Sequence, residues 1–100
     1  MGVSVLPKKE DGNVTIKVSG EFTFTMQREF RVAYESHSPN TRFRIDLSDA
    51  THIDSAGLGI LMAMRSKLGG EQARIEICRC KQPVRDLMDI FHFDQYFHIS

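Results

Sequence analysis

Hydrophobic and polar residues alternate along three stretches of the chain, and this period of two is typical of half-buried β-strands. The stretches are residues 13–20, 42–50 and 73–80. The third strand of the chain, within 42–50, is expected to end near residues 46–48. The side chains predicted to face the core are Val14, Ile16, Val18, Phe43, Ile45, Leu47, Ile75 and Ile77.

Two further extended segments, residues 3–7 and 95–100, are predicted to be short strands. Pro7 ends the first of them. The pair Asp11-Gly12 that follows is a hairpin signal, so the first two strands are expected to be antiparallel neighbours.

Three other stretches change to the helical period of about 3.6 residues. They are residues 25–37, 55–68 and 82–93. Thr25 is the expected N-cap of the first helix. Gly69-Gly70 is expected to end the second helix, and Pro83 suits the first turn of the third. The apolar stripe of the third helix comprises Val84, Leu87, Met88 and Phe91.

The predicted order is therefore β-β-α-β-α-β-α-β. Strands that alternate with helices indicate an α/β fold with a mixed, partly parallel sheet and helices packed on it. One hundred residues are enough for one small domain, residues 1–100, and no repeat or linker divides the chain.

Composition narrows the classes of function. Hydrophobic residues make up 41% and charged residues 26%, and the formal net charge is zero. A nucleic-acid-binding protein usually shows a basic excess, so we expect no nucleic-acid partner. We therefore predict that six of the seven phenylalanines form core rather than base-stacking surface; these are Phe22, Phe24, Phe30, Phe43, Phe91 and Phe93.

No apolar stretch approaches the roughly 20 residues that span a bilayer, and the N-terminus lacks a secretory signal pattern. The expected location is the cytoplasm, with no membrane partner. Cys78 and Cys80 form a C-x-C without a second ligand pair, and the four histidines lack zinc spacing. We therefore expect reduced thiols, no metal site and no cofactor.

The stretch HIDSAGLGI, residues 52–60, places Ser55 between a predicted strand and a predicted helix. Four roles are open for this serine. As an N-cap, its hydroxyl would accept a hydrogen bond from a backbone N–H two or three residues later. As a nucleophile it would need a base, but the G-x-S-x-G elbow is absent and only His52 is near in sequence.

A nucleotide-binding loop is the third role, but the single G-x-G lacks a third glycine and a Walker lysine. Phosphorylation is the fourth. A phosphate would add about −1.5 to −2 charges, and a helix N-terminus tolerates an anion. The fold would survive, while a partner fitted to a neutral surface would be repelled.

The helical wheel of residues 55–68 separates a buried face from an exposed one. Five residues are expected to face the sheet, namely Gly57, Ile60, Leu61, Met64 and Leu68. Ser55, Gly59, Met62 and Ser66 are expected to form an exposed stripe. Methionine among small residues makes an adaptable docking surface.

The segment IDLSDATHIDSAGLGIL, residues 45–61, resembles the signature of STAS domains, in particular bacterial anti-sigma factor antagonists. The similarity extends over roughly residues 3–98. The segments VSGEF, KLGGEQARIEI and PVRDLMDI also resemble the family. Two departures are Thr23, where many members carry an aspartate, and the absence after the last strand of a C-terminal helix found in many members.

This resemblance implies that Ser55 is phosphorylated by a serine kinase that is also an anti-sigma factor. The unphosphorylated form would bind that kinase or a similar regulator. Phosphorylation would weaken the complex by several kcal/mol of binding free energy, and a PP2C-type phosphatase would remove the phosphate. The chain would be a kinase substrate, not an enzyme. The predicted partner-binding residues are Asp54, Ser55, Ala56, Gly57, Leu58, Gly59, Met62 and Ser66.

Three other functions stay open. The chain could be a constitutive STAS subunit of a lipid ABC transporter or a signalling complex, a small nucleotide-binding domain or enzyme, or a purely structural domain. The oligomeric state, monomer or weak dimer, is also open.

Overall fold

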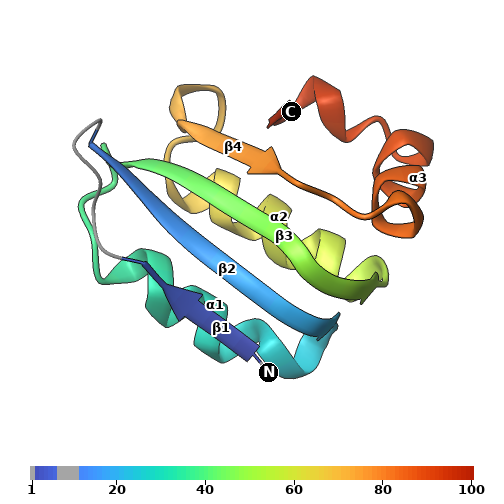
Figure 1. Ribbon diagram of the computed structural model, residues 1–100. Coiled ribbons are helices and arrows are strands. Elements are labelled where there is room, and N and C mark those ends of the chain that lie inside the picture. The colour runs from blue at the N-terminus through green and yellow to red at the C-terminus, as the bar shows by residue number, and fades with distance from the viewer. Residues whose placement is uncertain (1, 7–11) are drawn as a thin grey trace.

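A computed structural model describes residues 2–6 and 12–100, which form a five-stranded sheet with three α-helices (Figure 1). The strands are β1 (Gly2–Val5), β2 (Asn13–Phe22), β3 (Arg42–Ile53), β4 (Ile75–Cys78) and β5 (His98–Ile99). The α-helices are α1 (Gln27–Glu35), α2 (Ser55–Lys67) and α3 (Gln82–Ile90). Three 3₁₀ turns complete the described elements: η1 (Phe24–Met26), η2 (Gly70–Gln72) and η3 (Phe93–Gln95).

The sheet order is β1-β2-β3-β4-β5. β1 pairs with β2 antiparallel, and the other three pairings are parallel. The predicted α/β class and mixed sheet are therefore confirmed. Asp11 of the predicted hairpin signal lies outside the described residues.

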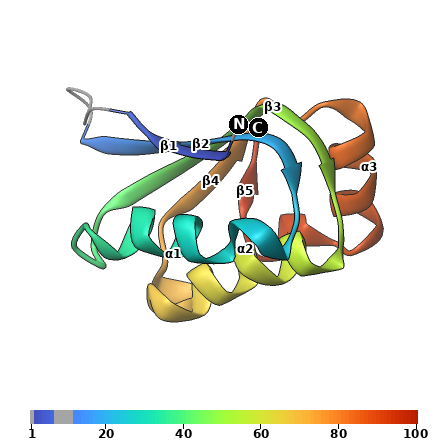
Figure 2. The same cartoon turned by 90° about the horizontal axis from the view of Figure 1, so that it is seen from below.

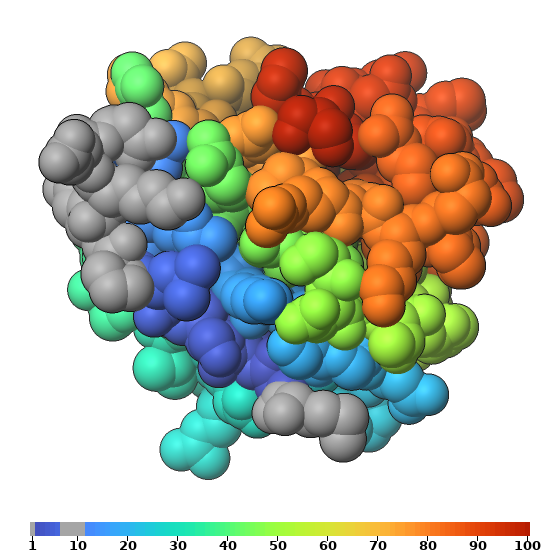
Figure 3. All heavy atoms as spheres, in the orientation of Figure 1, coloured from blue at the N-terminus to red at the C-terminus, as the bar shows by residue number. Residues whose placement is uncertain are grey.

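One face of the sheet carries the core. Figure 2 shows α1 and α2 side by side beneath this face, with α3 alongside the second half of β3. All eight strand residues predicted to face the core are buried. Among the described residues no helix lies over the opposite face (Figure 1 and Figure 3), which carries polar side chains, of which Thr15 and Asp46 are buried.

β3 is longer than predicted and runs without a loop to Ile53. Its pairing with β2 shifts register between Lys17 and Ser19 and again between Gly20 and Glu21. Extra residues on β3 at these points interrupt the alternation of side chains. The second half of the strand, with Ala50 and Ile53 buried, therefore looked like a loop in the sequence.

The ends of several helices also differ from the prediction. Thr25 is not an N-cap, because η1 precedes α1 and the N-cap of α1 is Met26. α3 ends at Ile90, since His92 has a left-handed φ of 53°. Two phenylalanines predicted as core are exposed, Phe24 by 69% and Phe91 by 52%.

The ends of the remaining strands shift as well. β4 ends at Cys78 because Arg79 adopts a φ of 62°, so Cys80 lies beyond the strand. β5 is shorter than the predicted segment and holds two residues. Gly69 and Gly70, with φ of 110° and 61°, end α2 as predicted.

Candidate functional site

The predicted site lies where β3 passes into α2, and a single residue connects the two elements. Asp54 has extended backbone dihedrals and is the N-cap of α2. Its Oδ1 accepts a hydrogen bond from the Gly57 backbone N–H at 2.9 Å. Its backbone carbonyl accepts from the Leu58 N–H at 3.0 Å. An aspartate at this position satisfies orphan amides and places negative charge at the positive end of the helix dipole.

Ser55 is the first residue of α2, not its cap. The capping role considered for Ser55 is therefore wrong, because the Asp54 carboxylate fills it. Ser55 is exposed. Apart from the N-cap Asp54, no acidic residue lies at the start of α2. Its hydroxyl is thus accessible and is not required to hold the helix end.

Gly57 sets how closely α2 approaches the sheet. A Cβ at this position would lie 2.2 Å from the backbone oxygen of Phe22 and 2.8 Å from Cγ1 of Ile53. Only glycine allows this approach, which brings the start of α2 against the ends of β2 and β3. Gly59 differs, since a Cβ there would meet nothing within 4 Å.

The predicted partner-binding residues divide between surface and core. Ser55, Gly59 and Ser66 are exposed, and Asp54, Ala56 and Met62 are half-buried. Gly57 and Leu58 are buried, so a partner cannot contact these two residues directly. Met62 packs against the core cluster, which limits the methionine of the predicted stripe to partial contact.

A groove between α1 and α2 adjoins this site. It has a volume of about 460 Å³, and Ala56, Gly59 and Ala63 of α2 line it. Phe24 of η1 and Arg31 of α1 also line it. The exposed surface of α2 therefore continues toward α1 rather than only along the predicted stripe.

Sequence reasoning missed the residues that α1 and η1 contribute to this groove. Phe24 was predicted to be part of the core, together with Phe22. β2 ends at Phe22, however, and the 3₁₀ turn directs Phe24 outward. The only signal in the sequence is that Phe24 lies between two threonines. That this phenylalanine is exposed is known from the structure.

The charge near the groove is mixed. Glu35 lies 3.7 Å from Lys67 Nζ and 4.0 Å from Arg31 Nε. On the other side of α2, Arg65 stacks on the Tyr96 ring at 5.2 Å and donates to the Tyr96 carbonyl at 3.1 Å. Arg65 therefore has an intramolecular role in holding η3 against α2.

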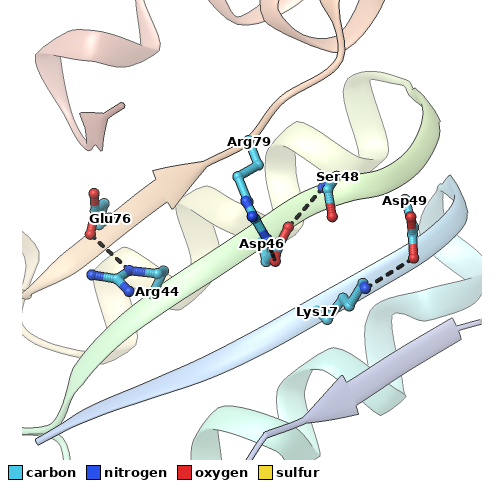
Figure 4. Close-up of polar contacts among 7 residues, drawn as sticks. All are labelled: Lys17, Arg44, Asp46, Ser48, Asp49, Glu76 and Arg79. Atoms are coloured by element: carbon cyan, nitrogen blue, oxygen red, sulfur yellow. Dashed lines mark hydrogen bonds and ion pairs between the residues drawn. The ribbon is translucent and has the colours of Figure 1, made fainter. Parts of the chain in front are cut away.

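The open face of the sheet carries a separate set of ion pairs (Figure 4). Lys17 and Asp49 lie 3.1 Å apart, and Arg44 Nε and Glu76 Oε1 also lie 3.1 Å apart. Asp49 comes shortly before Ser55 in the chain, but its pairing with Lys17 places it on the face opposite the helices. Among the residues drawn in Figure 4, three cations balance three anions, so these pairs leave no net charge.

Asp46 is the buried carboxylate of this face. Burial alone would raise its pKa, but hydrogen bonds from the Ser48 backbone and hydroxyl, with Arg79, outweigh burial and lower the pKa. The Ser48 N–H donates at 2.9 Å, and Arg79 lies at 3.5 Å. The pKa of Glu76 is lowered chiefly by the hydrogen bond from Ser100.

Metal binding finds no support in the described part of the chain. No group of three or more histidine, cysteine, aspartate or glutamate residues lies close enough there to hold an ion.

Burial raises the pKa of both cysteine thiols, that of Cys80 to about 11. Within residues 2–6 and 12–100, no helix is long and apolar enough to cross a membrane.

Comparisons with known proteins agree on one family. The family model described as "Mlab, STAS domain" matches residues 5–99. A "STAS-domain containing protein" of Pseudomonas aeruginosa is 38% identical over 101 residues, which is 100% of both chains.

Solved structures share the fold. An anti-sigma factor antagonist from Mycobacterium paratuberculosis superposes with a TM-score of 0.78 at 23% identity, over 99% of this chain and 86% of that one. The anti-sigma factor antagonist SpoIIAA in its unphosphorylated form gives a TM-score of 0.75 at 13% identity, over 99% and 88% of the two chains. At these identities the likeness concerns the fold.

Proposed function

Because this chain belongs to the STAS domain family, we propose that it is a partner-switching regulator of the anti-sigma factor antagonist type. The unphosphorylated form binds a serine kinase that is also an anti-sigma factor. Phosphorylation of Ser55 by that kinase releases the complex, and a PP2C-type phosphatase restores binding. The chain is the substrate of these enzymes and has no catalytic role of its own.

The observation that carries this proposal is that Asp54 caps α2 while Ser55 is exposed. The Asp54 carboxylate caps α2, so the exposed Ser55 hydroxyl is free to accept a phosphoryl group without loss of the cap. Unpaired N–H groups and the helix dipole favour an anion at this helix end. Phosphorylation is therefore expected to leave the fold intact.

The groove beside Ser55 explains why a phosphate would act on binding. Ala56 and Gly59 have small or absent side chains, and Phe24 offers an exposed aromatic ring next to them. A partner that packs on this surface meets these small side chains and the ring, and beside them Arg31 and Lys67, which both pair with Glu35. A phosphate on the neighbouring residue, next to the Asp54 carboxylate, would bring about two extra negative charges to that interface. We expect a loss of several kcal/mol of binding free energy.

The decisive experiment is intact-mass spectrometry of the protein purified from its own cells. A species about 80 Da heavier, the mass of one phosphoryl group, is expected in the wild type. It should vanish in Ser55→Ala and persist in the control Ser66→Ala, since Ser66 is another exposed serine of α2. Absence of the heavier species across several growth conditions would refute the phosphorylation step.

A capture experiment tests the binding step separately. Ser55→Ala used as bait in lysate of its own cells should retain a protein with a kinase domain, and Ser55→Asp should not. Ala63→Arg places a long side chain in the groove and leaves Ser55 unchanged. This variant should also fail to retain the kinase. Equal retention by Ser55→Asp and Ser55→Ala would contradict a switch that depends on charge.

A second candidate function is a constitutive STAS subunit of a lipid ABC transporter. The family model that matches this chain is described as "Mlab, STAS domain", and this description names no antagonist. It therefore supports a constitutive subunit as the alternative. A constitutive subunit needs no phosphorylation. Stable co-purification of transporter subunits with wild type, Ser55→Ala and Ser55→Asp alike would support it over partner switching.

A further inference from the structure

β1 is an edge strand whose outer side has no partner among the described residues. It is hydrogen-bonded to β2 alone and forms one border of the sheet (Figure 1). The Leu6 N–H donates to the Thr15 carbonyl at 2.9 Å, in register with the pairing of Ser4 with Lys17. In an antiparallel ladder the backbone groups of alternate residues point to opposite sides. The N–H and C=O groups of Val3 and Val5 therefore point away from the sheet.

Apolar side chains lie next to this free edge. A groove of about 420 Å³ separates β1 from α1, and it is lined by Val3 and Val5 of β1 and by Val32 and Ala33 of α1. Val5 is 42% exposed and Val32 is 57% exposed. Proteins usually protect an edge strand with charges, proline or a covering element, because unpaired strand backbone invites pairing. In β1, the two residues whose backbone groups point outward are instead valines, Val3 and Val5.

We propose that β1 pairs with β1 of a second copy of this chain, in antiparallel orientation, to form a symmetric dimer with one continuous sheet. A two-fold axis at Ser4 would place Val3 of each copy opposite Val5 of the other. The same patch then serves both subunits, as an isologous interface requires. The outward backbone groups of both edges would be paired, and the exposed valines would pack beside Val32.

Charge is compatible with a second copy. The groove carries one cation and one anion, Arg28 and Glu29, so two copies bring no net charge together. The whole chain also has a formal net charge of zero. A strand of four residues offers few backbone hydrogen bonds, so the dimer is expected to be weak and concentration-dependent.

The proposed dimer does not depend on the partner-switching function. α1 lies behind β1 and β2, whereas α2 lies behind β3 (Figure 1). Pairing at β1 would therefore leave Ser55 and the start of α2 accessible in both copies.

Sedimentation velocity over roughly 10–500 μM tests the proposal, a range suited to a weak association. Wild type should pass from monomer to dimer over this range. Val5→Lys and Val32→Asp, both at exposed positions that leave the core intact, should weaken association by about 100-fold or more. The matched control is Ile90→Lys, an apolar site on α3 that is 67% exposed, which should dimerise like wild type. Circular dichroism verifies that each variant is folded.

Hydrogen exchange identifies the interface directly. The amides of Val3 and Val5 should exchange more slowly as protein concentration rises, while the amide of Ser4, already turned toward β2, should change little. A wild type that stays monomeric at the highest concentration would overturn the proposal. So would a dimer that survives Val5→Lys, or one that leaves the Val3 and Val5 amides unprotected.

Discussion

Two glycines of α2, two residues apart, should respond to alanine in opposite directions. At Gly57 an alanine Cβ would lie 2.2 Å from the Phe22 carbonyl oxygen, a backbone atom that no side-chain rotation can move away. Real Cβ contacts essentially never fall below 3.0 Å, so α2 must shift outward by about 1 Å. At Gly59 the Cβ enters open space.

The magnitudes follow from packing and helix propensity. An outward shift loosens the contact of α2 with a core in which Phe22 and Leu61 are fully buried. Overpacking of this kind costs about 3 kcal/mol, and the better helix propensity of alanine offsets about 1 kcal/mol of it. We therefore expect Gly57→Ala to lower the free energy of unfolding by about 2 kcal/mol. Gly59→Ala should raise it by about 1 kcal/mol.

Urea unfolding followed by circular dichroism measures both changes, and thermal unfolding gives a second reading. For a domain of this size, 1 kcal/mol corresponds to about 4–8 °C in Tm. Gly57→Ala should thus melt roughly 8–16 °C below wild type, and Gly59→Ala roughly 4–8 °C above it. If Gly57→Ala matched or exceeded wild-type stability, the close approach of α2 to the end of β2 would be refuted as the reason for glycine there.

Three further predictions concern capping, acid and thiols. Asp54→Ala should lower the free energy of unfolding by about 1 kcal/mol, whereas Ser55→Ala should change it by less than about 0.5 kcal/mol because Ser55 is not the cap; equal losses in urea titrations would contradict the assignment of the cap. The pKa of Asp46 is lower when folded than when unfolded, so its contribution to stability is present above the ordinary aspartate value near 4 and is lost as pH falls through the folded pKa. Asp46→Asn should therefore lose less stability than wild type between about pH 5 and pH 2 in acid unfolding curves, and parallel curves would show that Asp46 has no such role. Burial raises the pKa of Cys80 to about 11 and also raises that of Cys78, so both thiols should react slowly with Ellman's reagent at pH 8 and fast in urea; rapid reaction of the folded protein would show that the thiols are accessible.

Local patterns in the sequence were enough to predict most of the elements and the side of the sheet that carries the core. The alternation in residues 13–20 and 42–50 depends on neighbours two apart, and burial of Ile16 and Ile45 follows directly from it. Gly69-Gly70 and Pro83 act within one turn of a helix, so their effect was also predictable. The candidate site could likewise be proposed from the sequence, because the Asp54–Gly59 motif is a continuous stretch of chain.

The extent of β3 and the direction of Phe24 were decided by pairing between distant segments. The register shifts against β2 add residues to β3 and break its alternation, and no local pattern records a bulge that exists only when two strands meet. Phe24 has a hydrophobic side chain after a buried strand, yet the turn into α1 directs it to the surface.

The sequence by itself determined the α/β element order, the buried faces and Ser55 as the candidate residue, since each depends on residue types and spacings within one segment. Only the tertiary structure decided that Asp54 rather than Ser55 caps α2, and that Gly57 is required by the Phe22 carbonyl. It also brought α1 beside α2 to form the groove and, among the described residues, left the outer edge of β1 without a partner strand. The physical reason is that a cap, a close approach, a groove and an open edge are relations between atoms of different segments, which come into being when the chain packs.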